Sequence, residues 1–240
     1  MAAKTKKIYA IFSGRHPGLY KTWDEASVQI TGFKGAKYKS FKQENDAITW
    51  LRECIISATE PVDENIVNLV KANNDLVTQS TSMESDTVII YTDGGASPNP
   101  GIGGYGIVLM KGRLRKELSA GYEYTTNNRM ELLACIVALR ALKESSNVKL
   151  HTDSKYVVDS ISKGWAKGWQ KKGWRKSDGK TAENIDLWKQ LLELIAIYDV
   201  EFVWVKGHAG NVENERCDVL ANQAKTAKKL LVDTGYTPTR

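Results

Sequence analysis

Cysteine is scarce in this 240-residue sequence, which contains only Cys54, Cys135 and Cys217. The number is odd and no CxxC spacing occurs, so we expect neither a disulfide framework nor a zinc site, and a reducing compartment is the default. Long apolar runs are also missing, since none approaches the roughly 20 residues that a membrane-spanning helix requires. The basic N-terminus is not followed by the apolar core of a signal peptide. We therefore expect a soluble, cytoplasmic protein with no membrane partner, and an organellar form stays open.

Charge is unevenly spread along the chain, whose net charge is +6. Residues 1–52 contain 10 basic and 4 acidic residues, residues 53–87 contain 1 and 7, and residues 88–240 contain 23 and 17. Two basic modules on either side of an acidic strip fit a polyanionic partner. Ordinary surface charge that maintains solubility explains the same numbers equally well. Apolar residues make up 42% of the sequence, which is enough for a packed core.

The pattern after residue 87 is that of an α/β domain. Alternating and β-branched runs predict strands, and periods near 3.6 residues predict helices. The expected strands cover residues 88–92, 105–110, 116–122, 148–152 and 200–206. The expected helices cover residues 154–163, 185–198 and 213–231, and one more is expected to begin at an Asn127 cap. This order of elements predicts a mixed sheet with helices covering its faces.

The first part of the chain reads as a smaller module. Thr22 or Asp24 can open a helix, and residues 45–56 have the pattern of a second, amphipathic helix. Residues 57–87 lack a strong period and end in the polar stretch TQSTSMESDT. We interpret residues 55–87 as a linker with at most a turn or two of helix. If about 35 residues are flexible, their ends lie roughly 30–35 Å apart. Two modules joined in this way can bind neighbouring stretches of one long ligand.

Four acidic residues of the second module occur where elements begin or end. Asp93 and Asp153 follow predicted strands, while Glu131 and Asp218 are expected near the starts of helices. Because strand ends and adjacent first helical turns converge on one edge of a mixed sheet, the four can meet there. Such a cluster is costly unless hard divalent cations neutralise it, and two ions roughly 4 Å apart can clamp the oxygens of a phosphoryl transfer. For each acid, capping or simple surface charge remains the alternative.

Four long stretches carry a family resemblance. They are YTDGGASPNPGIGGYG, AGYEYTTNNRMELLACIVAL, HTDSKYVVDSI and WVKGHAGNVENERCDVLA. Together they resemble ribonuclease H type 1, which cuts the RNA strand of RNA–DNA hybrids, over about residues 88–236. The resemblance implies the ribonuclease H fold, an α/β fold with a five-stranded mixed sheet flanked by helices, over residues 88–240.

The resemblance also implies a mechanism. Asp93, Glu131, Asp153 and Asp218 would bind two Mg²⁺ ions, with Mn²⁺ able to substitute, and Asp93 would bridge both ions. A metal-activated water would attack the scissile phosphate in line and leave 5′-phosphate and 3′-hydroxyl ends. His208, in the glycine-flanked stretch KGHAGN, would assist proton transfer or product departure, which agrees with an imidazole pKa near neutrality. A plain surface histidine is the alternative.

Contacts to the nucleic acid are implied in the same way. Asn99, Asn127 and Asn128 would read 2′-hydroxyls in the minor groove, where amides can donate and accept at once. Turn and cap chemistry explains these asparagines as well. Thr126 and Asn184 would form a pocket for a phosphate of the DNA strand. Tyr124 stands where many relatives have an arginine, so this pocket is expected to bind phosphate more weakly.

Residues 165–180 alternate tryptophans with basic residues and resemble the basic protrusion of bacterial-type ribonucleases H. The expected contacts to the DNA strand are Trp165, Trp169, Lys171 and Lys172. Trp174 is expected to be mostly structural. Packing of all three tryptophans onto the body of the domain is the alternative.

The N-terminal stretch from IYAIF to KYKSF resembles the hybrid-binding domain that precedes many ribonucleases H. The resemblance implies a small α+β domain over residues 1–54, with a linker over residues 55–87. The expected contacts are Trp23 and Tyr38 to the DNA backbone, and Arg15, Lys37 and Lys39 to phosphates. Ser40 replaces a lysine often found there, which is expected to reduce affinity. Core packing is the alternative for the two aromatic residues.

The leading hypothesis is therefore a monomeric, magnesium-dependent endonuclease whose partner is an RNA–DNA hybrid. A hybrid-binding protein that has lost catalysis is a second reading, and the intact set of acids argues against it. A different nuclease of the same superfold is a third. The asparagines and the histidine loop disfavour that reading.

Overall fold

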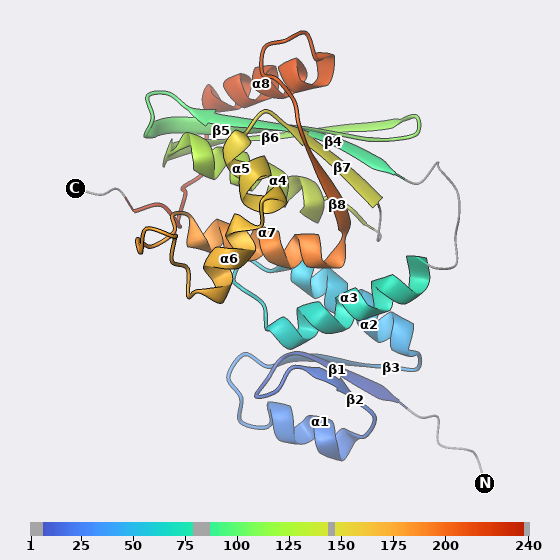
Figure 1. Ribbon diagram of the computed structural model, residues 1–240. Coiled ribbons are helices and arrows are strands. Elements are labelled where there is room, and N and C mark those ends of the chain that lie inside the picture. The colour runs from blue at the N-terminus through green and yellow to red at the C-terminus, as the bar shows by residue number, and fades with distance from the viewer. Residues whose placement is uncertain (1–6, 79–86, 144–146, 238–240) are drawn as a thin grey trace. The chain divides into compact units, whose positions relative to one another are not determined.

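The computed structural model in Figure 1 describes residues 7–78, 87–143 and 147–237. Contacts between residues divide the chain into two compact units, residues 1–82 and 83–240. Each unit has its own sheet and its own helices. Within the described ranges, no helix is both long and apolar enough to cross a lipid bilayer.

The N-terminal unit is built on a three-stranded antiparallel sheet in the order β2-β1-β3. Its strands are β1 (Ile8–Ser13), β2 (Gly18–Tyr20) and β3 (Lys37–Phe41). Helix α1 (Trp23–Ile30) lies on one face of the sheet, and α2 (Glu44–Ser57) lies on the other (Figure 1). Of the two helix starts that the sequence offered, Thr22 and Asp24, it is Thr22 that opens α1, through a capping box. The resulting α+β unit agrees with the expected fold of this module.

Helix α3 (Glu64–Thr78) lies inside the segment that the sequence indicated to be a linker. It packs on α2 and buries Ile66, Val67 and Val70. The structure thus differs from the expected turn or two of helix, because these few apolar residues find a partner surface that a local pattern does not show. Asparagines at 65, 68 and 73, among and beside these residues, weaken the period in the sequence. The domain limits at residues 54 and 88 remain a proposal.

The C-terminal unit contains a five-stranded mixed sheet in the order β6-β5-β4-β7-β8. Its strands are β4 (Val88–Ala96), β5 (Gly101–Lys111), β6 (Leu114–Thr125), β7 (Asn147–Thr152) and β8 (Asp199–Trp204). Strand β7 runs parallel to β4 and to β8, while the other pairings are antiparallel. The predicted α/β class and mixed sheet are confirmed.

Helices cover both faces of this sheet (Figure 1). They are α4 (Asn127–Arg140), α5 (Lys155–Ser162), α6 (Trp165–Lys171), α7 (Ile185–Ile197) and α8 (Val212–Lys225). Helix α8 lies alone on one face, against β4, β5 and β6. Helices α4, α5 and α7 lie on the other face, where Trp188 and Leu132 are fully buried.

Several predicted boundaries differ from the structure, including those of β4, α4 and α8. Strand β4 continues past residue 92 to Ala96, because β5 pairs with it up to Ala96↔Gly103. The N-cap of α4 is Thr126 and not Asn127, whose side chain bonds elsewhere. Helix α8 ends at Lys225, before the predicted residue 231. The following chain turns back, and the Leu231 N–H donates to the Gly121 carbonyl at 2.8 Å.

A buried ion-pair network fastens this returning chain to α4. Arg129, which is 2% exposed, donates to Asp233 through Nε at 2.7 Å and to Asp186 through Nη2 at 2.7 Å. The Thr125 hydroxyl donates to Asp233 as well, at 2.6 Å. Because both charges of the Arg129–Asp233 pair are removed from water, losing one partner leaves the other uncompensated.

We expect Asp233→Ala to lower the free energy of unfolding of the C-terminal unit by about 3 kcal/mol. The control is Asp178→Ala, whose exposed partner Lys180 lies 3.8 Å away. That control should cost less than about 1 kcal/mol. Urea unfolding followed by circular dichroism measures both variants. Equal losses would show that the buried network adds nothing specific.

Candidate active site and nucleic-acid interface

Two of the predicted acids lie side by side at one end of the sheet. The parallel ladder between β4 and β7 ends at the pair Thr92↔Thr152. Asp93 and Asp153 are the next residues along the chain after this pair, so they lie next to each other where the β4–β7 pairing ends. Asp93 still belongs to β4, because the other edge of that strand remains paired with β5. The sheet therefore holds the Asp93 backbone rigidly while its carboxylate stands beside Asp153.

Gly94 lets helix α4 pack closely on β4, which brings Glu131 beside Asp93 and Asp153. A Cβ atom on Gly94 would lie 2.5 Å from the Met130 carbonyl carbon and 2.8 Å from the Glu131 nitrogen. Only glycine lets α4 approach β4 this closely, which explains why residues with almost no side chain follow Asp93. The Ser154 hydroxyl, next to Asp153, donates to Glu131 Oε2 at 2.5 Å. This bond ties the third acid to the end of β7.

A second glycine admits the helix that carries Asp218. A Cβ on Gly106 would overlap the Cys217 carbonyl oxygen, so α8 lies directly on β5 beside Asp218. The sequence predicted Asp218 near the start of α8, but it is the seventh of the 14 residues of the helix Val212–Lys225 and so lies at its middle. The Asn222 side chain donates to Asp218 Oδ1 at 2.8 Å.

Burial and neighbouring negative charge both act on two of the acids. The pKa of Asp93 is raised to about 6, mainly by burial and also by the charges of Asp153 and Asp218, while the Gly94 N–H bond and the Lys225 ammonium partly offset the rise. The pKa of Glu131 is raised to about 7, and burial is again the largest cause. The Ser154 hydrogen bond opposes that rise, and the charges of Asp93 and Asp153 add to it. All four acids thus take part in one electrostatic cluster.

The donor set of this cluster fits hard divalent cations. Carboxylate oxygens are the ligands that Mg²⁺ prefers, and a cation would relieve the repulsion that raises these pKa values. In the part of the chain that the structure describes, no three His, Cys, Asp or Glu side chains already have the arrangement of a complete metal site. The acids would therefore have to close around an ion. The residues able to hold it are Asp93, Glu131, Asp153 and Asp218.

Asp153 is supported by residues that the sequence did not single out. Asn214, which is 2% exposed, donates through Nδ2 to Asp153 Oδ2 at 3.2 Å. The Trp204 indole N–H donates to the Asp153 carbonyl at 3.1 Å. A Cβ on Gly207 would lie 2.6 Å from Asp153 Oδ2, so this glycine leaves room for the carboxylate. The recognisable signal for Asn214 was its place as the first residue of the acid-bearing motif NERCD.

His208 lies in the connection between β8 and α8, at the same end of the sheet as Asp153. Its side chain is exposed, and its backbone is left-handed with φ 50°. Gly210 also has a positive φ, 83°, and Asn211 caps α8 by accepting from the Asn214 N–H. His208 thus lies on an exposed loop, and the end of this loop is fixed by the bond between Asn211 and Asn214, the residue that also bonds Asp153.

The three predicted groove-reading asparagines lie together at the start of α4. The Asn127 N–H donates to Asn99 Oδ1 at 3.2 Å, and Asn127 Oδ1 accepts from the Ala96 N–H at 2.7 Å. Asn128 is the next residue of α4 and is half-buried. Because these bonds occupy the amide oxygens of Asn99 and Asn127, their NH₂ groups are the ones available to a ligand.

The predicted phosphate pocket lies around the Arg129 network. Asn184 caps α7 with φ 56°, and its side chain bonds Tyr156 Oη at 3.4 Å and Arg129 Nη1 at 3.5 Å. Thr126 is half-buried at the N-cap of α4. Tyr124, which replaces the expected arginine, is 46% exposed and lies against the Tyr236 ring at 5.8 Å between centroids.

The predicted basic protrusion is organised around α6. Trp165 is 46% exposed, with Lys163 Nζ 4.9 Å from its ring centroid. Trp169 instead packs edge-on against the buried Trp188 at 5.9 Å. Lys171 and Lys172 are exposed at the end of α6. The structure therefore places Trp169 as an anchor of this segment, while Trp165 and the two lysines face solvent.

Aromatic side chains form a row on the α1 side of the N-terminal sheet. Trp23 lies 5.4 Å from Tyr9 and 6.1 Å from Tyr38 between ring centroids. Trp23 and Tyr38 are each 46% exposed, so they are not core residues. This row is a surface on which a sugar-phosphate backbone can pack.

The basic residues predicted beside this row occupy different places. Lys37 Nζ lies 5.0 Å from the Phe12 ring, and its charge and hydrogen bond act on Cys54 of α2. Lys39 Nζ lies 5.4 Å from the Phe41 ring, which packs on Trp50 of α2. Both lysines thus lie toward the α2 face. Arg15 Nη1 donates to the Val28 and Thr31 carbonyls, each at 2.8 Å, and so closes the end of α1.

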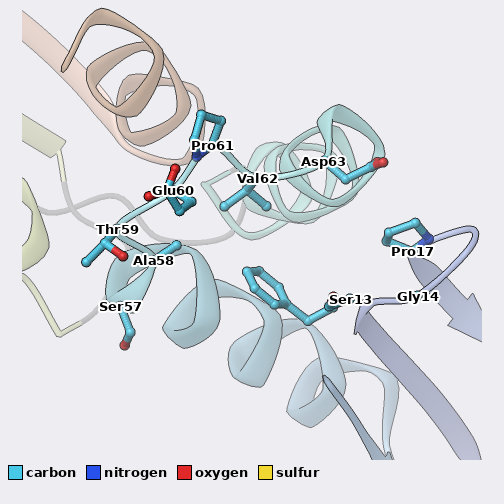
Figure 2. Close-up of a pocket in the computed structure, with 11 residues that line it drawn as sticks. Ser13, Gly14, Pro17, Ser57, Ala58, Thr59, Glu60, Pro61, Val62 and Asp63 are labelled. Carbon is cyan, nitrogen blue, oxygen red and sulfur yellow. The ribbon is translucent and has the colours of Figure 1, made fainter. Parts of the chain in front are cut away.

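A pocket of about 420 Å³ in this unit lies apart from the predicted residues. Figure 2 shows its lining around the end of β1 and the connection from α2 to α3, with Ser13, Thr59 and Asp63 among the residues. The Asp63 carboxylate already accepts from the Asn65 N–H at 2.9 Å. None of the predicted contacts lines this pocket, so it supports no part of the predicted interface.

A five-stranded mixed sheet in this order, with acids gathered where the pairing of β4 with β7 ends, defines the ribonuclease H class of fold. The family model described as RNase H matches residues 85–226, and that of the ribonuclease H1 N-terminal domain matches residues 7–51. The chain belongs to the ribonuclease H family, whose members are nucleases that generally use divalent metal ions.

Individual relatives agree with this assignment. The chain is 56% identical to ribonuclease H of Syntrophus aciditrophicus over 149 residues, which covers 62% of this chain and 86% of that protein. It is 53% identical to ribonuclease HI of a Synechocystis species over 152 residues, covering 63% and 95%. Among solved structures, LC9-RNase H1, a type 1 RNase H with the type 2 active-site motif, matches with a TM-score of 0.54 and 31% identity. That match covers 60% of this chain and 74% of the other.

Proposed function

We propose that this protein is an endonuclease that cleaves the RNA strand of RNA–DNA hybrids with the help of two divalent cations. Mg²⁺ is the proposed ion, and Mn²⁺ is able to replace it. The observation that carries the proposal is the shared electrostatics of Asp93, Glu131, Asp153 and Asp218 at one end of the sheet. The proposed site lies in the unit that matches the ribonuclease H family.

The proposed chemistry follows from what each side chain can do. Bound cations would activate water and stabilise charge on the scissile phosphate, giving 5′-phosphate and 3′-hydroxyl ends. Asp93, whose strand is paired on both sides up to Thr92, would be a rigidly placed ligand of the cations. Glu131 and Asp153 are oriented by Ser154 and Asn214. His208 stands on an exposed loop, from which an imidazole can carry a proton to or from the site.

Recognition of the hybrid would use groups of both units. The NH₂ groups of Asn99, Asn127 and Asn128 would donate to 2′-hydroxyls or base edges in the minor groove. Thr126 and Asn184 would hold a phosphate of the DNA strand with neutral donors, since Tyr124 supplies no charge. The aromatic row of the N-terminal unit would pack against the DNA backbone. Lys37 and Lys39, toward the α2 face, and Arg15, at the end of α1, would attract phosphates from outside this row. All of these contacts come from one chain, and we propose that it acts as a monomer.

The decisive test compares three labelled duplexes in magnesium: an RNA–DNA hybrid, double-stranded RNA and double-stranded DNA. We expect cleavage of the RNA strand of the hybrid alone. Binding of the hybrid without cleavage would identify a non-catalytic binding protein. Cleavage of the DNA duplex would identify another nuclease of this fold.

We expect the double change Lys171→Ala and Lys172→Ala to raise KM several-fold and to lower the slope of log KM against log salt by about two, because each lysine neutralises one phosphate. The control is the double change Arg175→Ala and Lys176→Ala. Arg175 bonds the Gly179 carbonyl and Lys176 pairs with Glu183, so they should matter less. Steady-state kinetics over a salt series measures both, and an unchanged slope in the first variant would count against the contact.

We expect deletion of residues 1–82 to reduce processive cleavage of long hybrids while cleavage of short ones is retained. The physical reason is that a tethered binding unit raises the effective concentration of the catalytic unit near a long substrate. The cut removes α3 together with α2, since the two helices pack on each other. Loss of short-substrate cleavage in a folded C-terminal unit would refute the tether.

A further inference from the structure

Lys225, in the last turn of α8, lies across a bare patch of the sheet. Gly95 of β4 and Gly104 of β5 are cross-strand partners, so no side chain rises from the sheet at this pair. A Cβ on Gly104 would lie 3.2 Å from Lys225 Cγ, and a Cβ on Gly95 would lie 3.7 Å from Lys225 Nζ. The stem of the lysine therefore follows the glycine pair from β5 toward β4, and its ammonium ends above Gly95.

This position puts the ammonium beside two groups of the proposed site. A Cβ on Gly95 would also lie 3.6 Å from Asn127 Oδ1, so Lys225 and Asn127 face each other across the glycine. Asp93 is two residues before Gly95 on the same face of β4, and the charge of Lys225 reaches it. The lysine is half-buried, with its charged end toward this rim.

The ammonium has no charged partner of its own within the described ranges. Its hydrogen bond goes to the amide oxygen of Asn222 at 3.0 Å, and Asn222 in turn donates to Asp218. An ammonium has three donors, so at least two remain for another acceptor. The acceptors expected at the rim of a nuclease site are phosphate oxygens, which would also compensate the charge.

We propose that Lys225 contacts a backbone phosphate of the bound nucleic acid next to Asn127. This inference rests on the proposed function, because it assumes a duplex lying over Gly95 and Gly104. The glycine pair gives a sugar-phosphate backbone room to approach the sheet. A cation at this point would hold the strand close to the acids without taking part in the chemical step.

The other explanation for Lys225 is local, since a cation in the last turn of a helix stabilises the helix dipole. A role in stability predicts a change in melting temperature but no change in how hybrid binding responds to salt. A role in orienting Asp218 through Asn222 predicts a fall in kcat with KM unchanged. The phosphate contact alone predicts a salt-dependent change in affinity.

The test uses the full chain with Lys225→Met, which keeps the apolar stem and removes the charge. Lys225→Arg is the conservative variant, and Lys228→Met removes an exposed charge of the same sign just beyond α8. Each is also made in an Asp153→Asn background, and its Kd for a short hybrid is measured over a series of KCl concentrations. We expect Lys225→Met to weaken binding several-fold at low salt and to lower the slope of log Kd against log salt by about one, and Lys225→Arg to restore both.

The possible outcomes distinguish failure of the Lys225 contact from failure of the proposed nuclease function. If the wild-type chain cleaves the hybrid but Lys225→Met has the slope of Lys228→Met, the phosphate contact is wrong and the function stands. A fall in kcat alone overturns the contact in favour of Asp218 positioning. If the wild-type chain neither binds nor cleaves a hybrid, both statements fall.

Discussion

Replacing Asp93 with asparagine is expected to reduce kcat for hybrid cleavage by on the order of a thousandfold or more, with hybrid binding retained. The change removes only the charge, because an amide oxygen can still accept the 2.7 Å bond from the Gly94 N–H. The strand pairings on which Asp93 sits are made by the backbone and are unaffected. Activity therefore reports the loss of a cation ligand and not a loss of structure.

The matched control is Asp199→Asn, at the opposite end of the sheet, where β8 begins and its side chain is exposed. It makes the same chemical change and should leave kcat and KM unaltered. Single-turnover cleavage of a labelled hybrid measures both variants, and gel-shift assays measure binding. Near-normal cleavage by Asp93→Asn, or an equal loss in the control, would remove this carboxylate from the proposed site.

The second large effect concerns stability in the absence of divalent cations. Glu131→Gln is expected to stabilise the metal-free protein by about 1–3 kcal/mol at pH 8 and to have almost no effect at pH 4. The pKa of Glu131 rises from its ordinary 4.5 to about 7 on folding, so the folded protein disfavours the ionised form. The resulting cost is absent below pH 4.5, grows as the pH rises to about 7, and is constant above that. Glutamine removes the cost and can still accept the Ser154 hydrogen bond.

Thermal unfolding in EDTA at several pH values measures this prediction, and added magnesium supplies its control. A cation that binds the folded site should raise the melting temperature of the wild-type protein more than that of Glu131→Gln. The variant would then be the more stable protein without metal and lose that advantage with it. A stabilisation that does not depend on pH would place Glu131 outside the cluster.

The sequence predicted the parts of this site that depend on local pattern. Asp93 and Asp153 each follow a run typical of a buried strand, and parallel strands bring their ends together, so their meeting could be anticipated. The expected class of fold followed from the same alternation of strands and helices. The start of α1 was narrowed to Thr22 or Asp24, because a cap is confined to neighbouring residues, and the structure selects Thr22.

Other features depend on contacts between distant residues and leave little trace in the sequence. Gly94 and Gly106 matter because helices α4 and α8 touch them, which only the packed structure reveals. Asn214 and Lys225 reach the site from α8, far from β4 and β7 in the chain. Helix α3 was missed because its buried residues are few, and α8 was predicted too long because Leu231 pairs with β6 instead.

The most direct test of the central claim is to count and place the cations themselves. Asp153→Asn would weaken the cation site, so the protein to crystallise is the full-length wild-type chain, with Mn²⁺ and a non-cleavable hybrid. Anomalous scattering would then locate the ions. We predict two peaks about 4 Å apart, both within ligand distance of Asp93 and enclosed by Glu131, Asp153 and Asp218. Peaks elsewhere, or a bound hybrid with no ion at these carboxylates, would contradict the account.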